Sequence, residues 1–134
     1  ERELQTEEEI FAEFLRQSEE GNARGFYYVS VAYTSGTGVA RNYIEAEKWA
    51  REAAERGVTS GIRHLGLFHQ LGQGMPVNRV EAQKWYYALA ALLPDDEPFL
   101  SEVNAKYMSE GQLAEARAQA DAWLKAWGEK QSDS

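Results

Sequence analysis

Residues 42–54 read NYIEAEKWAREAA and residues 78–90 read NRVEAQKWYYALA, so the second stretch repeats the first after 36 residues. The same offset also matches small residues that precede both stretches. The identical pairs are Gly21/Gly57, Gly25/Gly61, Gly36/Gly72, Gly38/Gly74, Asn42/Asn78, Glu45/Glu81, Ala46/Ala82, Lys48/Lys84, Trp49/Trp85 and Ala54/Ala90. So many identities in one register, a tryptophan among them, indicate an internal repeat.

Each repeat predicts two helices, because its apolar residues recur every three to four positions between start and stop signals. The first helix is expected over about 23–35 and ends at Gly36, which can adopt the left-handed conformation that closes a helix. The second begins at Asn42 as N-cap, with Glu45 as its capping-box partner, and ends at Gly57. Its predicted buried stripe is Tyr43, Ala46, Trp49, Ala50, Ala53 and Ala54.

The same logic divides the whole chain into five segments. Residues 1–20 form a half repeat or cap, with Thr6 and Glu9 as start signals, and 21–56 and 57–93 are the two repeats. The second repeat has helices near 59–71 and 78–93, and Pro94 follows it. Residues 94–127 are expected to form a diverged capping pair, with helices at 99–108 and 109–127, and 128–134 a frayed tail.

The repeat resembles the Sel1-like repeat, a relative of the tetratricopeptide repeat. Gly36-Thr37-Gly38-Val39 carries the resemblance in the first copy, together with Asn42, Ala46, Trp49, Ala53-Ala54 and Gly57. In the second copy Leu65-Gly66, Gly72-Gln73-Gly74 and Lys84-Trp85-Tyr86 carry it. The aromatic residue that usually ends the first helix is Tyr33 in one copy and His69 in the other. The resemblance implies an all-α fold, a right-handed α-α solenoid of about seven helices.

The resemblance also implies a protein-interaction scaffold, frequently bacterial, with a concave groove lined by the first helix of each pair. Family members are often periplasmic or secreted, which favours those locations for this chain, although a cytoplasmic one stays open. The half repeat before Gly21 is compatible with a piece of a longer array.

Helical geometry indicates which side chains face such a groove. If Val29, Ser30 and Tyr33 pack inward, other positions of the first helix turn outward. The predicted partner-binding residues are Arg24, Tyr27, Val31 and Thr34, with Ser60, Arg63, Leu67 and Gln70 as their counterparts in the second repeat. Tyr and Arg are frequent interface anchors, so Arg24, Tyr27 and Arg63 are the strongest candidates, against the alternative that they only cover the surface.

The charge of the chain narrows the class of partner. It has 14 basic and 22 acidic residues, a net charge of −8, which argues against nucleic acid and anionic membranes. No stretch approaches the length of a membrane-spanning helix. Residues 1–21 hold eight Glu against Arg2 and Arg16. This acidic segment is either a solvated helix face or a docking surface for a basic partner.

No catalytic, cofactor or metal site is predicted. His64 and His69 are five residues apart, whereas two ligands on one helix face need four. Asp95, Asp96 and Glu97 lack the spacing of a calcium loop, and the chain contains no cysteine. Pairs such as Glu45 with Glu47 lie on outward helix faces, where nothing separates their pKa values for acid–base chemistry.

The sequence therefore predicts a non-enzymatic protein that binds a protein or peptide in its groove as an adaptor or regulator. One alternative is an inhibitor or immunity-type protein that occludes a bacterial effector enzyme. Another is a hydrolase with an unrecognised carboxylate site. No small-molecule substrate is expected.

Overall fold

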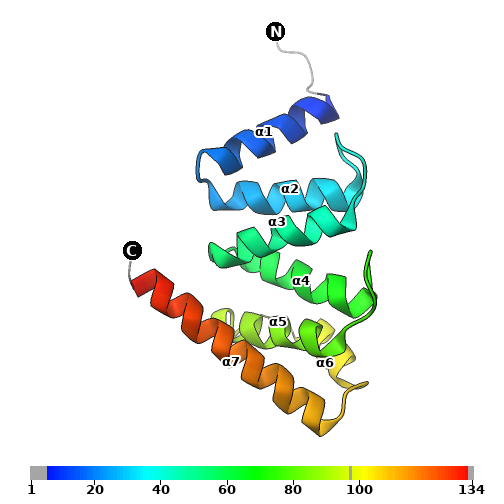
Figure 1. Cartoon of the computed structure of the whole chain (residues 1–134), viewed down its shortest axis with the longest axis vertical. Coiled ribbons are helices and arrows are strands. Elements are labelled where there is room, and N and C mark those ends of the chain that lie inside the picture. The colour runs from blue at the N-terminus through cyan, green and yellow to red at the C-terminus, as the bar shows by residue number, and fades with distance from the viewer. Residues whose placement is uncertain (1–5, 97, 133–134) are drawn as a thin grey trace. The chain divides into compact units, whose positions relative to one another are not determined.

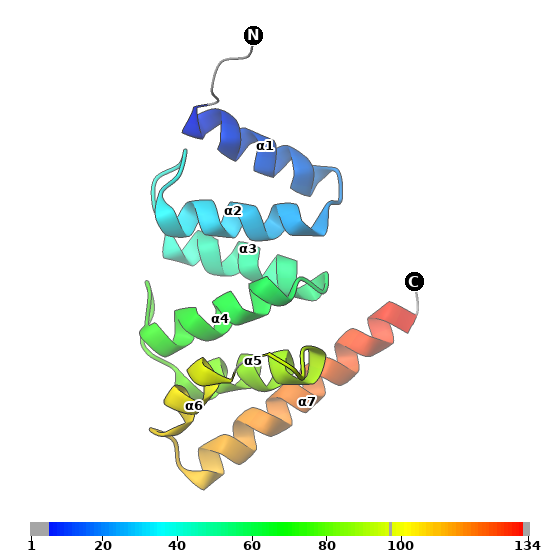
Figure 2. The same cartoon turned by 180° about the vertical axis from the view of Figure 1, so that it is seen from behind.

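The computed structural model describes residues 6–96 and 98–132, and within these ranges it contains helices and no strand (Figures 1 and 2). The prediction of an all-α fold with about seven helices is confirmed. The helices are α1 (Glu7–Glu19), α2 (Ala23–Ser35), α3 (Tyr43–Glu55), α4 (Thr59–Leu71), α5 (Arg79–Leu92), α6 (Phe99–Ala105) and α7 (Glu110–Ser132). The chain divides into two compact units, Glu1–Gly61 and Ile62–Ser134, which are described separately. No helix in the described ranges has the length and apolar composition needed to cross a bilayer.

The residues predicted as N-caps do cap the first turns of α1, α3 and α5. At α1, Thr6 Oγ1 accepts from the Glu9 amide and Glu9 Oε1 accepts from the Thr6 amide, which completes the predicted capping box. Asn42 and Asn78 cap α3 and α5, each accepting from the amide of the third residue of its helix. Gly36, with φ of 76°, ends α2 as predicted.

The capping box predicted at Asn42 is only half correct. The Asn42 amide donates to the carbonyl of Tyr33 instead of the Glu45 side chain, and Glu45 pairs with Lys48. The second repeat has the equivalent hydrogen bond, in which the Asn78 amide donates to the carbonyl of His69. The glycine-containing loop returns the chain to the end of the preceding helix, where an unpaired carbonyl is within reach.

In the first unit, small residues let α2 and α3 pack side by side (Figure 1). Ser30 is fully buried and its hydroxyl donates to the carbonyl of Ala46 at 2.6 Å. The other fully or almost fully buried side chains of this pair are Val29, Ala32, Ala46, Ala50, Ala53 and Ala54. Aromatic pairs join α1 to α2, with ring centroids 5.5 Å apart for Phe11–Tyr33 and 5.1 Å for Phe14–Tyr28.

In the second unit, α7 lies against α5 (Figure 2). Trp123 meets the buried Trp85 edge to face at 5.2 Å, and the guanidinium of Arg117 lies 4.0 Å from the Tyr87 ring. Ala116 and Ala120 of α7 are buried in this contact region, so small residues again permit close approach of two helices.

A buried amide attaches α6 to α5. The Asn104 side chain is fully buried and donates to Gln83 Oε1 and to the carbonyl of Arg79, both at 3.0 Å. Arg79 donates back to Asn104 Oδ1, and Gln83 donates to the hydroxyl of Ser101. Because these polar groups satisfy one another, the network fixes a short helix that has no side-chain cap of its own.

The C-terminal helix differs from its predicted length. The structure places α7 at Glu110–Ser132, so the described part of the segment expected to be frayed is helical. Glu129, Lys130 and Gln131 are good helix formers, and the Ser132 hydroxyl donates to the carbonyl of Gly128. Residues 133 and 134 lie outside the described ranges. The preceding helix ends at Ala105, earlier than expected.

The two equivalent tryptophans lie in different environments. Trp85 is 1% exposed, as a core position requires, but Trp49 is only half-buried, and so is Tyr43 at the start of the same helix. The predicted buried stripe of α3 is therefore correct for its alanines and wrong for these two aromatic residues. In the second unit Trp123 covers Trp85, whereas Trp49 packs against Phe26 with ring centroids 5.8 Å apart.

Candidate functional site

The predicted binding residues of the first repeat lie along one side of α2. Arg24, Tyr27, Val31 and Thr34 follow each other at spacings of three and four residues, which places them on one helix face. Arg24 is exposed and the other three are half-buried. Tyr27 contacts the ring of Tyr28, and the Thr34 hydroxyl donates to the carbonyl of Ser30. The face therefore combines aromatic, apolar and cationic groups.

Arg24 and Ser60, two of the predicted binding residues, meet in one hollow of about 260 Å³. The beginning of α2 contributes Ala23 and Arg24, and the end of α3, the following turn and the first two residues of α4 contribute the rest. The other lining residues are Arg56, Gly57, Val58 and Thr59. The structure thus brings together two residues that are 36 positions apart in the sequence.

Arg56 belongs to this hollow, although the sequence did not single it out. Its guanidinium lies 3.9 Å from the centroid of the Phe26 ring and donates to Glu52 Oε1 at 2.6 Å. These contacts hold the side chain of Arg56 in place at the end of α3. The signal was present, since Arg56 directly precedes the helix-ending Gly57, but its proximity to Arg24 depends on how the helices pack.

In the second repeat the predicted binding residues differ in how far they are exposed to a partner. Arg63 is about one-third exposed and forms an ion pair with Asp96 at 2.7 Å, and Leu67 is half-buried. The prediction for Gln70 is wrong, because Gln70 is buried and its Oε1 accepts from the Tyr86 hydroxyl at 2.6 Å. A buried tyrosine hydroxyl needs a partner, and the amide of Gln70 provides it.

Two titratable groups of the second unit are shifted by their surroundings. Burial, and secondarily the positive charge of Arg63, lowers the pKa of His64. Burial also raises the pKa of the Tyr86 hydroxyl. In the described ranges no three His, Cys, Asp or Glu side chains gather as metal ligands would, and Glu97 of the Asp95–Glu97 cluster lies outside those ranges. The carboxylate of Asp96 is engaged by Arg63.

Comparison with known families identifies the repeat. The family model described as "Sel1 repeat" matches residues 27–58 and again residues 60–92. The chain therefore contains two Sel1 repeats. The two matched segments correspond to the repeats found at an offset of 36 residues, and they cover α2 with α3 and α4 with α5.

Solved structures agree with the Sel1 repeat fold. A protective antigen of uropathogenic Escherichia coli strains, described as displaying an SLR fold, is similar with a TM-score of 0.80 and 22% identity over 93% of this chain. A Sel1 repeat protein from Oxalobacter formigenes has a TM-score of 0.65 and 26% identity over 79% of this chain. This chain spans only 28% and 42% of the lengths of these two proteins. No curated protein matches the sequence.

The fold class is accordingly that of Sel1 repeat solenoids, and a bacterial origin is consistent with both similar structures. Sel1 repeats generally mediate protein–protein interactions, and their fold is typically a non-catalytic scaffold. The family therefore directs attention to a partner protein and to the surface that binds it.

Proposed function

We propose that this chain binds a protein or peptide partner through the outward face of α2 and the adjacent hollow, as a non-enzymatic adaptor or regulator. The observation that carries the proposal is the hollow, where the exposed Arg24 lies with Arg56 and the hydroxyl-bearing Thr59 and Ser60. Arginine is a frequent interface anchor because its planar guanidinium forms paired hydrogen bonds.

The charges of the hollow support a specific kind of partner segment. Its lining contains two arginines and no acidic residue, although the chain as a whole carries a net charge of −8. A carboxylate of the partner would pair with Arg24, whose side chain is exposed, while Arg56 stays paired with Glu52 beside it. Tyr27 and Val31 supply apolar contact area farther along α2.

In the second repeat, Gln70 is excluded and Ser60 lies in the hollow, so Arg63 and Leu67 on α4 are the further candidates. Arg63 would have to exchange its ion pair with Asp96 for a partner carboxylate. Exposed and half-exposed ion pairs contribute little to stability, so such an exchange is inexpensive.

The test is affinity capture from lysate and envelope fractions of the source cell, with quantitative mass spectrometry. The wild-type chain is compared with Arg24→Glu and with the control Arg41→Glu, which makes the same change at another exposed arginine of the first unit. We expect recovery of the partner to fall about tenfold or more with Arg24→Glu. We expect no change with Arg41→Glu. An acidic residue in the first turn of α2 is compatible with the helix, so the fold should persist.

A partner recovered equally by the wild type and Arg24→Glu would contradict the proposal that α2 and its hollow bind it. Thermal unfolding of both variants checks the interpretation. Equal unfolding midpoints assign a loss of capture to the binding surface, whereas a lower midpoint for Arg24→Glu would show that Arg24 stabilises the fold.

A further inference from the structure

Met108 places a sulfur atom beside the buried amide that attaches α6 to α5. The residue lies in the short connection between α6, which ends at Ala105, and α7, which begins at Glu110. Its side chain is half-buried, and its Sδ lies 3.5 Å from Nδ2 of the fully buried Asn104. The chain contains two methionines and no cysteine, so its sulfur chemistry belongs to Met75 and Met108.

The side-chain amide of Asn104 has more acceptors around it than hydrogens to donate. Its Nδ2 carries two N–H groups, and in the described ranges it lies within hydrogen-bonding distance of three acceptors. These are Gln83 Oε1 and the Arg79 carbonyl, both at 3.0 Å, and Met108 Sδ at 3.5 Å. A thioether sulfur is a weak acceptor, so it leaves the two hydrogens to the two oxygens. The attachment of α6 therefore depends on a weak acceptor at residue 108.

We propose that Met108 is an oxidation-sensitive site, and that its conversion to methionine sulfoxide by hydrogen peroxide releases α6 from α5. A lone pair of the sulfur attacks one peroxide oxygen, so that an S–O bond forms while the O–O bond breaks. The sulfur is oxidised by two electrons, and the proton of the transferred oxygen passes to the departing hydroxide, which leaves as water. The proposal does not depend on the function assigned to α2.

The added oxygen acts against the α6–α5 attachment in two ways. It is a much stronger acceptor than the sulfur, so it competes for the two N–H groups of Asn104. Gln83 is only 1% exposed, and its Oε1 would be left buried without its donor. Oxidation also converts a half-buried apolar side chain into a polar one that favours water. Because α6 has no side-chain cap of its own, we expect it to separate from α5.

The test is hydrogen exchange measured by NMR on the full chain carrying Met75→Leu, in which Met108 is the one methionine left to oxidise. Hydrogen peroxide is added, and mass spectrometry verifies the oxidation. The amides of Glu102 and Lys106 report on α6, because both take part in its helical hydrogen bonds. We expect them to exchange about tenfold faster after oxidation, while the amide of Ala46 in α3 keeps its rate.

Met108→Leu is the matched control, since it conserves the volume of the side chain and leaves Met75 to react. Peroxide should not change the exchange of α6 in this chain. Methionine sulfoxide reductases should restore slow exchange in the oxidised Met75→Leu chain. Met108→Gln places an oxygen acceptor at the same position without peroxide, and it should also accelerate the exchange of α6.

Two results would overturn the proposal. One is an unchanged exchange rate of Glu102 and Lys106 after verified oxidation of Met108, because the sulfoxide oxygen would then point away from Asn104. The other is an equal acceleration of Ala46, which would show that oxidation destabilises the whole chain instead of releasing α6.

Discussion

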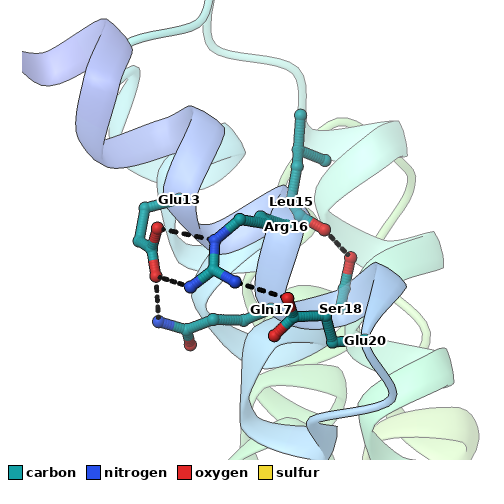
Figure 3. Close-up of polar contacts among 6 residues, drawn as sticks. All are labelled: Glu13, Leu15, Arg16, Gln17, Ser18 and Glu20. Carbon is teal, nitrogen blue, oxygen red and sulfur yellow. Dashed lines mark hydrogen bonds and ion pairs between the residues drawn. The ribbon is translucent and has the colours of Figure 1, made fainter.

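A single arginine organises the charges on the outer side of α1. Arg16 donates to both carboxylate oxygens of Glu13, one turn earlier, and to Glu20, one turn later (Figure 3). Gln17 also donates to Glu13. The hydrogen bonds from Arg16 and then from Gln17 lower the pKa of Glu13 to about 2.

These hydrogen bonds predict that the contribution of Glu13 to the stability of the fold depends on pH. A lowered pKa means that Glu13 favours the folded state above its ordinary pKa of 4.5, and that this contribution is lost as the pH falls from 4.5 toward 2. We expect Arg16→Gln to raise the pKa of Glu13 toward 4.5, as followed by NMR of its side-chain carboxyl carbon. The control Arg41→Gln should leave that pKa unchanged. A Glu13 pKa that is the same with and without Arg16 would contradict the assignment.

At the level of residues, the sequence predicts well what depends on near neighbours. The caps by Thr6, Asn42 and Asn78 were predictable because donor and acceptor lie three residues apart. The burial of Gln70 was not, because its partner Tyr86 lies on another helix and has Ala50 as its counterpart in the first repeat. Helical spacing gives the direction of a side chain, but the residue opposite decides whether it is exposed.

At the level of helix pairs, the two repeats place side chains of different size at equivalent positions of the helix–helix contact. In the second repeat Gly66 faces Tyr86, and a Cβ at residue 66 would lie 2.4 Å from the Tyr86 ring. In the first repeat the corresponding residues are Ser30 and Ala50. The large side chain of Tyr86 on α5 thus fits against α4 because Gly66 has no side chain there, so the two helices can still pack closely.

This complementarity predicts opposite effects for the same substitution at two glycines. Gly66→Ala should lower the free energy of unfolding by about 1–3 kcal/mol, because Tyr86 is buried and its hydroxyl is bound to Gln70. Gly128→Ala should raise it by up to about 1 kcal/mol, because a Cβ there meets nothing within 4 Å and alanine favours a helix. Urea denaturation measures both. Equal effects of the two substitutions would refute the packing of Gly66 against Tyr86.

The existence and type of the helices followed from periodicity, but the surroundings of the tryptophans did not. Trp49 and Trp85 occupy the same repeat position, but Trp85 is buried and meets Trp123 of α7, whereas Trp49 is half-buried and packs against Phe26. α7 lies outside the recognisable repeats, so no comparison of one repeat with the other predicts which face it covers. The polar composition of residues 128–134 predicts fraying, but α7 continues to Ser132.

Across the whole chain, the distribution of charge and the position of the repeats indicate different candidate binding surfaces. Residues 1–21 carry eight Glu against two Arg, while the hollow beside α2 is lined by Arg24 and Arg56. The acidic segment would attract a basic partner, whereas the hollow suits a carboxylate. The Sel1 repeats, which generally mediate protein–protein interaction, begin at α2, and this favours the hollow and the face of α2 over α1.

The most direct test of this account is photo-crosslinking in the source cell from a benzophenone side chain placed at one position at a time. One probe replaces Val31 on the outward face of α2, and the other replaces Glu8 on the acidic face of α1. Binding through the repeats predicts that the probe at Val31 gives a discrete covalent adduct with a partner protein and that the probe at Glu8 does not. An adduct from Glu8 alone would contradict the account and assign the interaction to the acidic helix.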